Sequence, residues 1–126
     1  MTVRADQVCY SLKAAMACSD DLLTKEWYAL TRNAKSVTAG HCYIAAEAAY
    51  HALGGKAAGL VSYVARCPWG GTHWWVETLT GVKVDPTAEQ YTSEGLAPPY
   101  HLGRRCGFLT SKPSKRAAEL LRRAGL

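Results

Sequence analysis

The sequence lacks the long apolar run that a membrane-spanning helix needs. No uninterrupted apolar segment approaches the roughly 20 residues required to cross a bilayer. Residues 1–13 carry charge early and lack the apolar stretch and small-residue cleavage site of a secretory signal. We therefore expect a cytoplasmic protein without a membrane partner.

The chain also lacks paired cysteines. A secreted disulfide framework favours an even number of cysteines, and a zinc site uses closely spaced ligands. Here the number is odd and no C-x-x-C pair occurs, so we expect no metal and no cofactor. Most of the thiols are expected to be buried as small apolar side chains. The five cysteines are Cys9, Cys18, Cys42, Cys67 and Cys106.

The net charge of +5 is unevenly distributed along the 126 residues. Seven basic residues and one acidic residue lie between Arg104 and Leu126, so the rest of the chain is nearly neutral. Such a segment is typical of a solvated helix face or of a contact with nucleic acid or an anionic surface. Both interpretations stay open at this point.

Hydrophobic spacing predicts an α+β fold in a single domain, residues 1–126. We expect N-terminal helices and a cysteine-bearing helix to pack on a small sheet, whose short connections favour antiparallel pairing. A stretch rich in Gly, Pro and Tyr, residues 87–113, is predicted to be irregular. The predicted helices cover about residues 5–17, 19–32, 42–54 and 114–125, and the predicted strands cover 60–66, 72–79 and 82–84.

Cys42 lies at the predicted start of an alanine-rich helix. A helix N-terminus offers about half a positive charge and free N–H groups, which lower a thiol pKa from about 8.5. Gly40 allows a substrate carbonyl to approach the backbone, and the Cys42 N–H is a candidate oxyanion donor. Taken alone, this pattern is more typical of a buried structural cysteine.

A cysteine nucleophile needs a base, and the base needs an acceptor that orients it. His73 lies on a predicted strand, and a tight turn at Thr80 and Gly81 is expected to bring Asp85 back beside it. Taken singly, His73 is better interpreted as a core histidine and Asp85 as part of an Asx turn. Taken with Cys42, they favour a Cys–His–Asp triad.

Three segments resemble those of the transglutaminase-like superfamily, which is related to papain. The segment GHCYIAAEAAYHALGG (40–55) looks like that family's G-x-C helix, THWWVE (72–77) is similar to its H-x-W-x-E strand, and VKVDPT (82–87) to its closing D-P-T. The resemblance covers under half of the chain. It implies a papain-like or transglutaminase-like core in which Cys42 is the nucleophile, His73 the general base and then acid, and Asp85 the orienting carboxylate.

The resemblance further implies acyl transfer through a thioester. We expect a cysteine hydrolase or acyltransferase that acts on an amide or isopeptide bond of a protein, a peptide or a small molecule. Trp75 would shape the pocket, and Glu77 would be a structural hydrogen-bond or ion-pair partner. The oxyanion side chain that the family usually supplies upstream of the cysteine is not obvious.

Other residues are candidates for substrate binding or for the oxyanion site. His41 is a second candidate base, but neighbouring helix residues point in different directions. Arg104 and Arg105 would suit an acidic or phosphate-bearing substrate if they border the cleft. The candidates for the oxyanion side chain are, in order of preference, Asn33, Tyr28 and Gln7.

Two other classes of function are consistent with the sequence. One is a non-enzymatic nucleic-acid-binding module that uses the basic C-terminal helix and exposed aromatic residues. The other is a catalytically inactive member of the superfamily that keeps the fold. The sequence leaves the substrate and the oligomeric state open.

Overall fold

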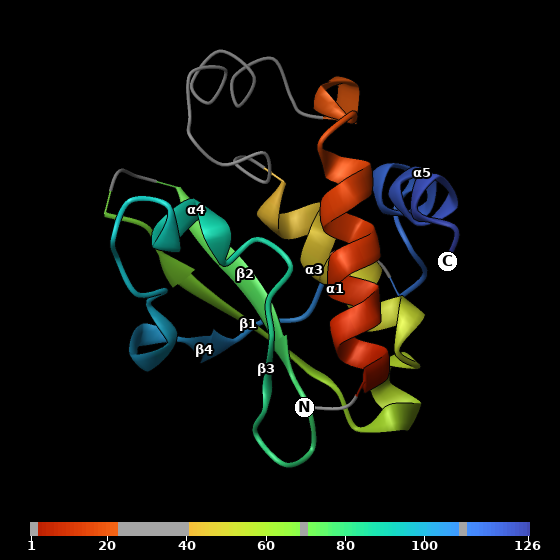
Figure 1. Ribbon diagram of the computed structural model, residues 1–126. Coiled ribbons are helices and arrows are strands. Elements are labelled where there is room, and N and C mark those ends of the chain that lie inside the picture. Colours follow the sequence, from red (N-terminus) through yellow and green to blue (C-terminus); the bar gives the residue numbers. More distant parts are fainter. Residues whose placement is uncertain (1–2, 23–40, 69–70, 109–110) are drawn as a thin grey trace.

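The protein is an α+β fold in which a small antiparallel sheet packs against a layer of helices (Figure 1). The computed structural model describes residues 3–22, 41–68, 71–108 and 111–126. These residues form four helices and a four-stranded sheet of order β3-β2-β1-β4, which confirms the predicted α+β class. The helices are α1 (Val3–Met16), α3 (Cys42–Ala52), α4 (Glu89–Thr92) and α5 (Lys115–Ala124), and the strands are β1 (Val61–Arg66), β2 (Thr72–Glu77), β3 (Lys83–Val84) and β4 (Arg104–Arg105).

Helix α3 is the centre of the helical layer because its side chains are small. Ala45, Ala46, Ala48 and Ala49 are fully buried. They allow α3 to pack closely on α1, α5 and β2 at once. The small-residue face predicted for this helix is therefore confirmed, and Cys42 is its first residue, as expected.

The two outer helices bury the apolar stripes that their sequences predict. On α1, the side chains of Val8, Leu12 and Met16 recur at helical spacing and are buried. Helix α5 begins after Ser114, whose Oγ caps it by accepting the Ala117 N–H at 3.2 Å. Of the helix predicted over residues 19–32, the structure describes a 3₁₀ turn at Asp20–Leu22, and the remainder lies outside the described residues.

The sheet contains the predicted meander and one further strand. Gly81, with a φ of 85°, closes the turn between β2 and β3, where the Thr78 N–H donates to the Val82 carbonyl at 2.9 Å. The fourth strand, β4, pairs with β1 at Tyr63 and Val64. The prediction that residues 87–113 are irregular is therefore wrong in part, since they contain α4, a 3₁₀ turn at Tyr100–Leu102 and β4.

The two faces of β2 have different surroundings. Trp74 and Val76 point toward the helical layer, where Trp74 meets the Tyr43 ring of α3. His73 and Trp75 point to the opposite face, where α4 covers His73. In Figure 1, α4 lies apart from the group formed by α1, α3 and α5. In the described part of the chain, no helix has the length and apolar character to span a membrane.

Candidate active site

A buried hydrogen bond joins His73 of the sheet to Asp85. His73 lies on β2 and Asp85 directly follows β3, so the turn at Gly81 brings them onto neighbouring strands. The His73 Nε2 lies 2.7 Å from the Asp85 Oδ2, and the side chains are 0% and 3% exposed. Because the carboxylate accepts, Nε2 is the protonated ring nitrogen. The predicted proximity of these two residues is confirmed.

The Asp85 carboxylate is held by several donors. Its Oδ2 also accepts the Tyr100 hydroxyl at 2.8 Å, and burial together with Asp85 raises the pKa of that phenol. Its Oδ1 accepts the Thr87 N–H at 3.2 Å, which is the Asx-turn contact that the sequence suggested. One oxygen therefore closes the Asx turn, and the other accepts the hydrogen bond from the histidine.

The Cys42 thiol lies against the backbone of β2 on either side of His73. Its Sγ–H donates to the Thr72 carbonyl at 3.1 Å, and the Trp74 N–H faces the sulfur. The Cys42 residue is 8% exposed. Burial raises the pKa of this thiol to about 12, although the Trp74 and Tyr43 N–H groups lower it in part.

The expectation that the pKa of Cys42 lies below its usual value is therefore wrong for this structure, because burial outweighs the lowering by the Tyr43 N–H at the start of α3. The partial charge of a helix end is a modest effect, whereas removing a thiolate from water is a large one. The resting thiol is neutral at physiological pH. It is hydrogen-bonded to a carbonyl, as a structural cysteine would be.

The second ring nitrogen of His73 meets α4, which the sequence did not predict. The Gln90 Nε2 lies 2.6 Å from His73 Nδ1. The Tyr91 ring meets the imidazole edge-on, with 4.9 Å between centroids, and its hydroxyl donates to Cys67 Sγ at 2.8 Å. The signal that was available is the Asx turn at Asp85, because such turns often precede a short helix.

Trp75 forms the floor beneath His73. Its ring stacks on the imidazole at 5.7 Å and 26°, and it is fully buried. The Trp75 Nε1–H donates to Glu77 Oε2 at 3.1 Å, so Glu77 is the hydrogen-bond partner that was expected. Trp74 packs on the other face of β2, against the Tyr43 ring.

The structure thus places the Cys42 thiol on the backbone that flanks His73, and a buried hydrogen bond joins His73 to Asp85. Comparison with protein-family models, with curated proteins and with solved structures finds no match to this chain. The contacts of Cys42, His73 and Asp85 are therefore the basis for assigning a function.

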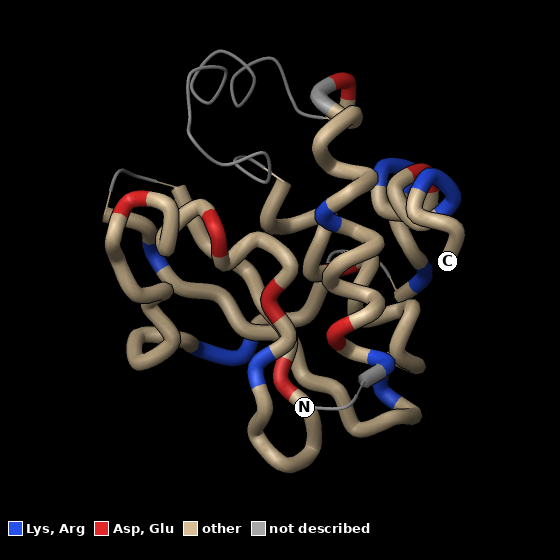
Figure 2. Tube along the Cα trace, in the orientation of Figure 1, with Lys and Arg blue, Asp and Glu red and all other residues tan. Residues whose placement is uncertain are grey.

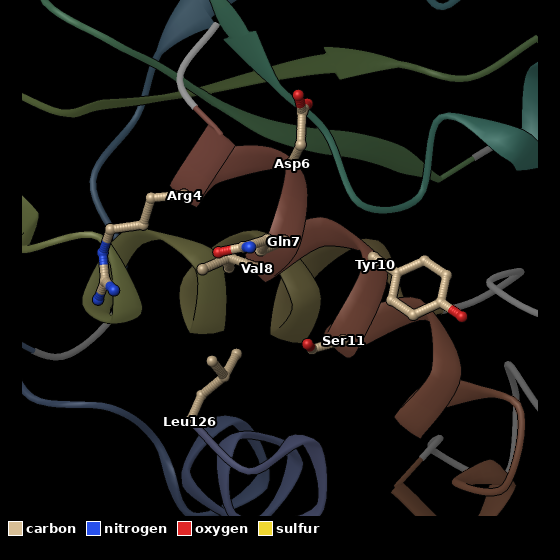
Figure 3. Close-up of a pocket in the computed structure, with 7 residues that line it drawn as sticks. All are labelled: Arg4, Asp6, Gln7, Val8, Tyr10, Ser11 and Leu126. Carbon is tan, nitrogen blue, oxygen red and sulfur yellow. The ribbon is translucent and has the colours of Figure 1, made fainter.

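The side chains of the remaining candidates for the oxyanion site have other partners, are exposed, or cannot be placed. Asn33 and Tyr28 lie outside the described residues. His41 is fully buried, and its Nε2 donates to the Ser19 carbonyl at 3.0 Å. Gln7 is exposed on α1 and lines a hollow that this helix forms with Leu126 (Figure 3).

Arg104 and Arg105 lie on β4, at the opposite edge of the sheet from β3. Both residues are exposed, and strands β1 and β2 separate them from Asp85. The structure therefore does not bring these two residues to His73 and Asp85. In the described ranges, no group of three or more His, Cys, Asp or Glu residues is placed to hold a metal ion.

The basic helix α5 uses much of its charge within the protein. Figure 2 shows acidic segments beside its basic ones. Arg123 pairs with both Asp21 and Glu119, and Arg122 pairs with Glu119. Arg116 donates to the Leu22 carbonyl. Three guanidinium groups thus have intramolecular partners, which leaves less charge for phosphate contacts than the sequence suggests.

Proposed function

We propose that this chain is a cysteine hydrolase or acyltransferase that acts on an amide or isopeptide bond through a thioester at Cys42. The observation that carries the proposal is the buried 2.7 Å hydrogen bond between His73 and Asp85, beside the backbone that the Cys42 thiol contacts. A carboxylate that holds one imidazole nitrogen leaves the other as the base for a nucleophile. The antiparallel sheet and the helix that begins at Cys42 support a transglutaminase-like or papain-like core.

The proposed reaction begins with proton transfer from Cys42 Sγ to His73 Nδ1. The sulfur electron pair then forms a bond to the substrate carbonyl carbon, and the oxyanion is stabilised by N–H groups in the first turn of α3. His73 returns the proton to the leaving amine as the C–N bond breaks, which gives the thioester. Water or a second amine then attacks the thioester carbonyl and loses a proton to His73. The C–S bond breaks, the acyl group is released, and the Cys42 sulfur takes the proton back from His73.

The second candidate is an inactive member that keeps the fold, and one observation favours it. The Cys42 thiol is buried and donates to a backbone carbonyl, so in this state it is a satisfied structural group. The nucleic-acid-binding alternative has less support, because the arginines of α5 pair with acidic residues and a carbonyl. Reactivity at Cys42 distinguishes the enzyme from the inactive member.

The test is acylation by an activated ester, p-nitrophenyl acetate, with peptide mass spectrometry locating the acyl group. We expect the wild-type protein to form a thioester at Cys42. In the His73→Ala variant, loss of the general base should slow this step by about 10²- to 10⁴-fold. The exposed His101 provides the matched control, since His101→Ala should react like the wild type.

The outcome that contradicts the proposal is equally specific. Cys18 is the exposed cysteine of the described residues and reports simple accessibility. If the acyl group accumulates on Cys18 and Cys42 stays unmodified, or if Cys42 reacts at the same rate with and without His73, the enzyme assignment fails. A protein that is folded but unreactive at Cys42 would be the inactive member.

A further inference from the structure

Both ring nitrogens of His73 have partners in this structure. Nε2 donates to Asp85, and Nδ1 lies 2.6 Å from the Gln90 side-chain amide nitrogen. A neutral imidazole has one donor nitrogen and one acceptor nitrogen. The Gln90 N–H therefore donates into the only lone pair that His73 has available for accepting a proton.

The Cys42 thiol is satisfied in the same state. Its proton is donated to the Thr72 carbonyl, not to His73. These two hydrogen bonds must break, and the thiol must come within hydrogen-bond reach of Nδ1, before a proton passes from sulfur to imidazole. A general base must lie within hydrogen-bond reach of the proton that it takes, and here the acceptor is occupied.

Contacts made by the neighbouring residues hold Gln90 in place. Tyr91 donates to Cys67 Sγ at 2.8 Å and packs its ring on His73. Glu89 pairs with Lys13 of α1 at 3.2 Å, with both side chains partly exposed. Helix α4 has a single turn, so these contacts, rather than intrinsic helix stability, position the Gln90 amide.

We infer that Gln90 is a positioning residue that acts as a latch, holding His73 in a resting state in which the imidazole cannot accept the Cys42 proton. This inference rests on the proposed function. When the Gln90 N–H leaves Nδ1, the proton of the Cys42 Sγ–H bond passes to that nitrogen. The electron pair of this bond stays on the sulfur, so the site gains a thiolate and an imidazolium with no change in its total charge.

The latch acts among several titratable groups, and each of them affects a pH profile. They come from every element that packs around the imidazole. Asp85 meets His73 directly, and burial raises the pKa of the thiols and phenols nearby. The groups around His73 and its carboxylate are Cys42 on α3, Cys67 after β1, Asp85 after β3, Tyr91 on α4, Tyr100 in the 3₁₀ turn and Cys9 on α1.

The test compares the rate of iodoacetamide alkylation at Cys42 in the wild type, Gln90→Ala and Gln90→Leu. The leucine variant keeps most of the volume of glutamine and removes its donor. We expect both variants to raise the rate near neutral pH by about 10²-fold, the size of a general-base contribution. The midpoint of the rate's pH dependence should also shift to lower pH, because the thiolate now forms by transfer to His73.

Matched variants separate the latch from a simple opening of α4. Thr92→Ala changes an exposed residue of α4 and should leave the rate unchanged. Adding His73→Ala to Gln90→Ala should abolish the gain. A Gln90→Ala rate equal to that of the wild type, or a gain that persists without His73 at an unchanged pH midpoint, would overturn the latch.

The latch and the proposed function fail in different ways. If ester acylation at Cys42 depends on His73 but not on Gln90, the enzyme assignment stands and the latch is wrong. If no variant shows acylation that depends on His73, the proposed function is wrong, and the latch fails with it.

Discussion

Replacing Asp85 with asparagine tests the proposed triad with almost no change in side-chain shape. In the structure, one carboxylate oxygen accepts from His73 and Tyr100, and the other accepts from the Thr87 N–H and, at 3.4 Å, from its hydroxyl. Asparagine offers one acceptor oxygen and one NH₂ group at the same two positions. In either orientation, the NH₂ group of the asparagine therefore faces a group that also donates a hydrogen bond.

The two orientations have different consequences. With the NH₂ toward His73, the ring proton moves to Nδ1, where it faces the Gln90 amide and the base is lost. With the NH₂ toward Thr87, the Asx turn loses its acceptor. One buried unsatisfied donor costs about 1–3 kcal/mol, so we expect the free energy of unfolding to fall by about that amount. A typical domain, stable by about 5–15 kcal/mol, would still be folded.

The expected loss of activity is much larger than the loss of stability. Replacing the orienting carboxylate of such a triad by an amide lowers the rate by about 10⁴-fold, which is about 5 kcal/mol of activation free energy. The assay is the rate of ester acylation at Cys42, with far-UV circular dichroism to verify folding. Tyr100→Phe is the control, because it removes one hydrogen bond to the same carboxylate oxygen and keeps the charge of Asp85. We expect it to change the acylation rate by less than about tenfold. A folded Asp85→Asn protein that acylates within about threefold of the wild type would refute the role of Asp85.

Two further predictions concern stability. Glu47 is fully buried, and its carboxylate accepts the Ser114 N–H and hydroxyl at 2.7 and 2.8 Å. We therefore expect Glu47→Ala to lower the free energy of unfolding by about 3–5 kcal/mol and Glu47→Gln by about 1–3 kcal/mol. Urea titration measures both changes. A loss below about 1 kcal/mol in Glu47→Ala would contradict this. Burial raises the folded-state pKa of Cys42 to about 12, whereas the unfolded-state pKa is near 8.5–9. The neutral thiol therefore contributes stability that is fully present below about pH 8.5. This contribution is lost as the pH rises toward 12. The difference in unfolding free energy between wild type and Cys42→Ala, measured under reducing conditions, should shrink over that range; a constant difference would be evidence against it.

The parts of the site that the sequence predicts are those fixed by local geometry. Period-two alternation and the tight turn at Gly81 are enough to bring Asp85 beside His73, because both depend on residues within one hairpin. The start of α3 at Cys42 follows in the same way from the change in spacing after Gly40. These features require no knowledge of distant residues.

The parts that the sequence does not predict depend on distant contacts or on elements too short to show a period. Helix α4 has four residues and β4 has two, so neither repeats an apolar pattern. Gln90 therefore gives no signal of its contact with His73. The partner of Glu47 lies 67 residues away, at the cap of α5, and the burial that raises the pKa of Cys42 comes from several elements at once.

The raised pKa of Cys42 and its proposed role as nucleophile are compatible, because they describe different proton transfers. Loss of the thiol proton to water would place a second negative charge near Asp85 in a buried site, and both burial and this carboxylate disfavour it. Transfer to His73 creates a thiolate and an imidazolium together, so the total charge of the site stays the same. Asp85, 2.7 Å from the imidazole, then stabilises the new positive charge. On the proposed mechanism, the thiol stays neutral toward solvent and reacts only when the imidazole is free to accept its proton. We therefore expect the Gln90 contact to set the reactivity of Cys42.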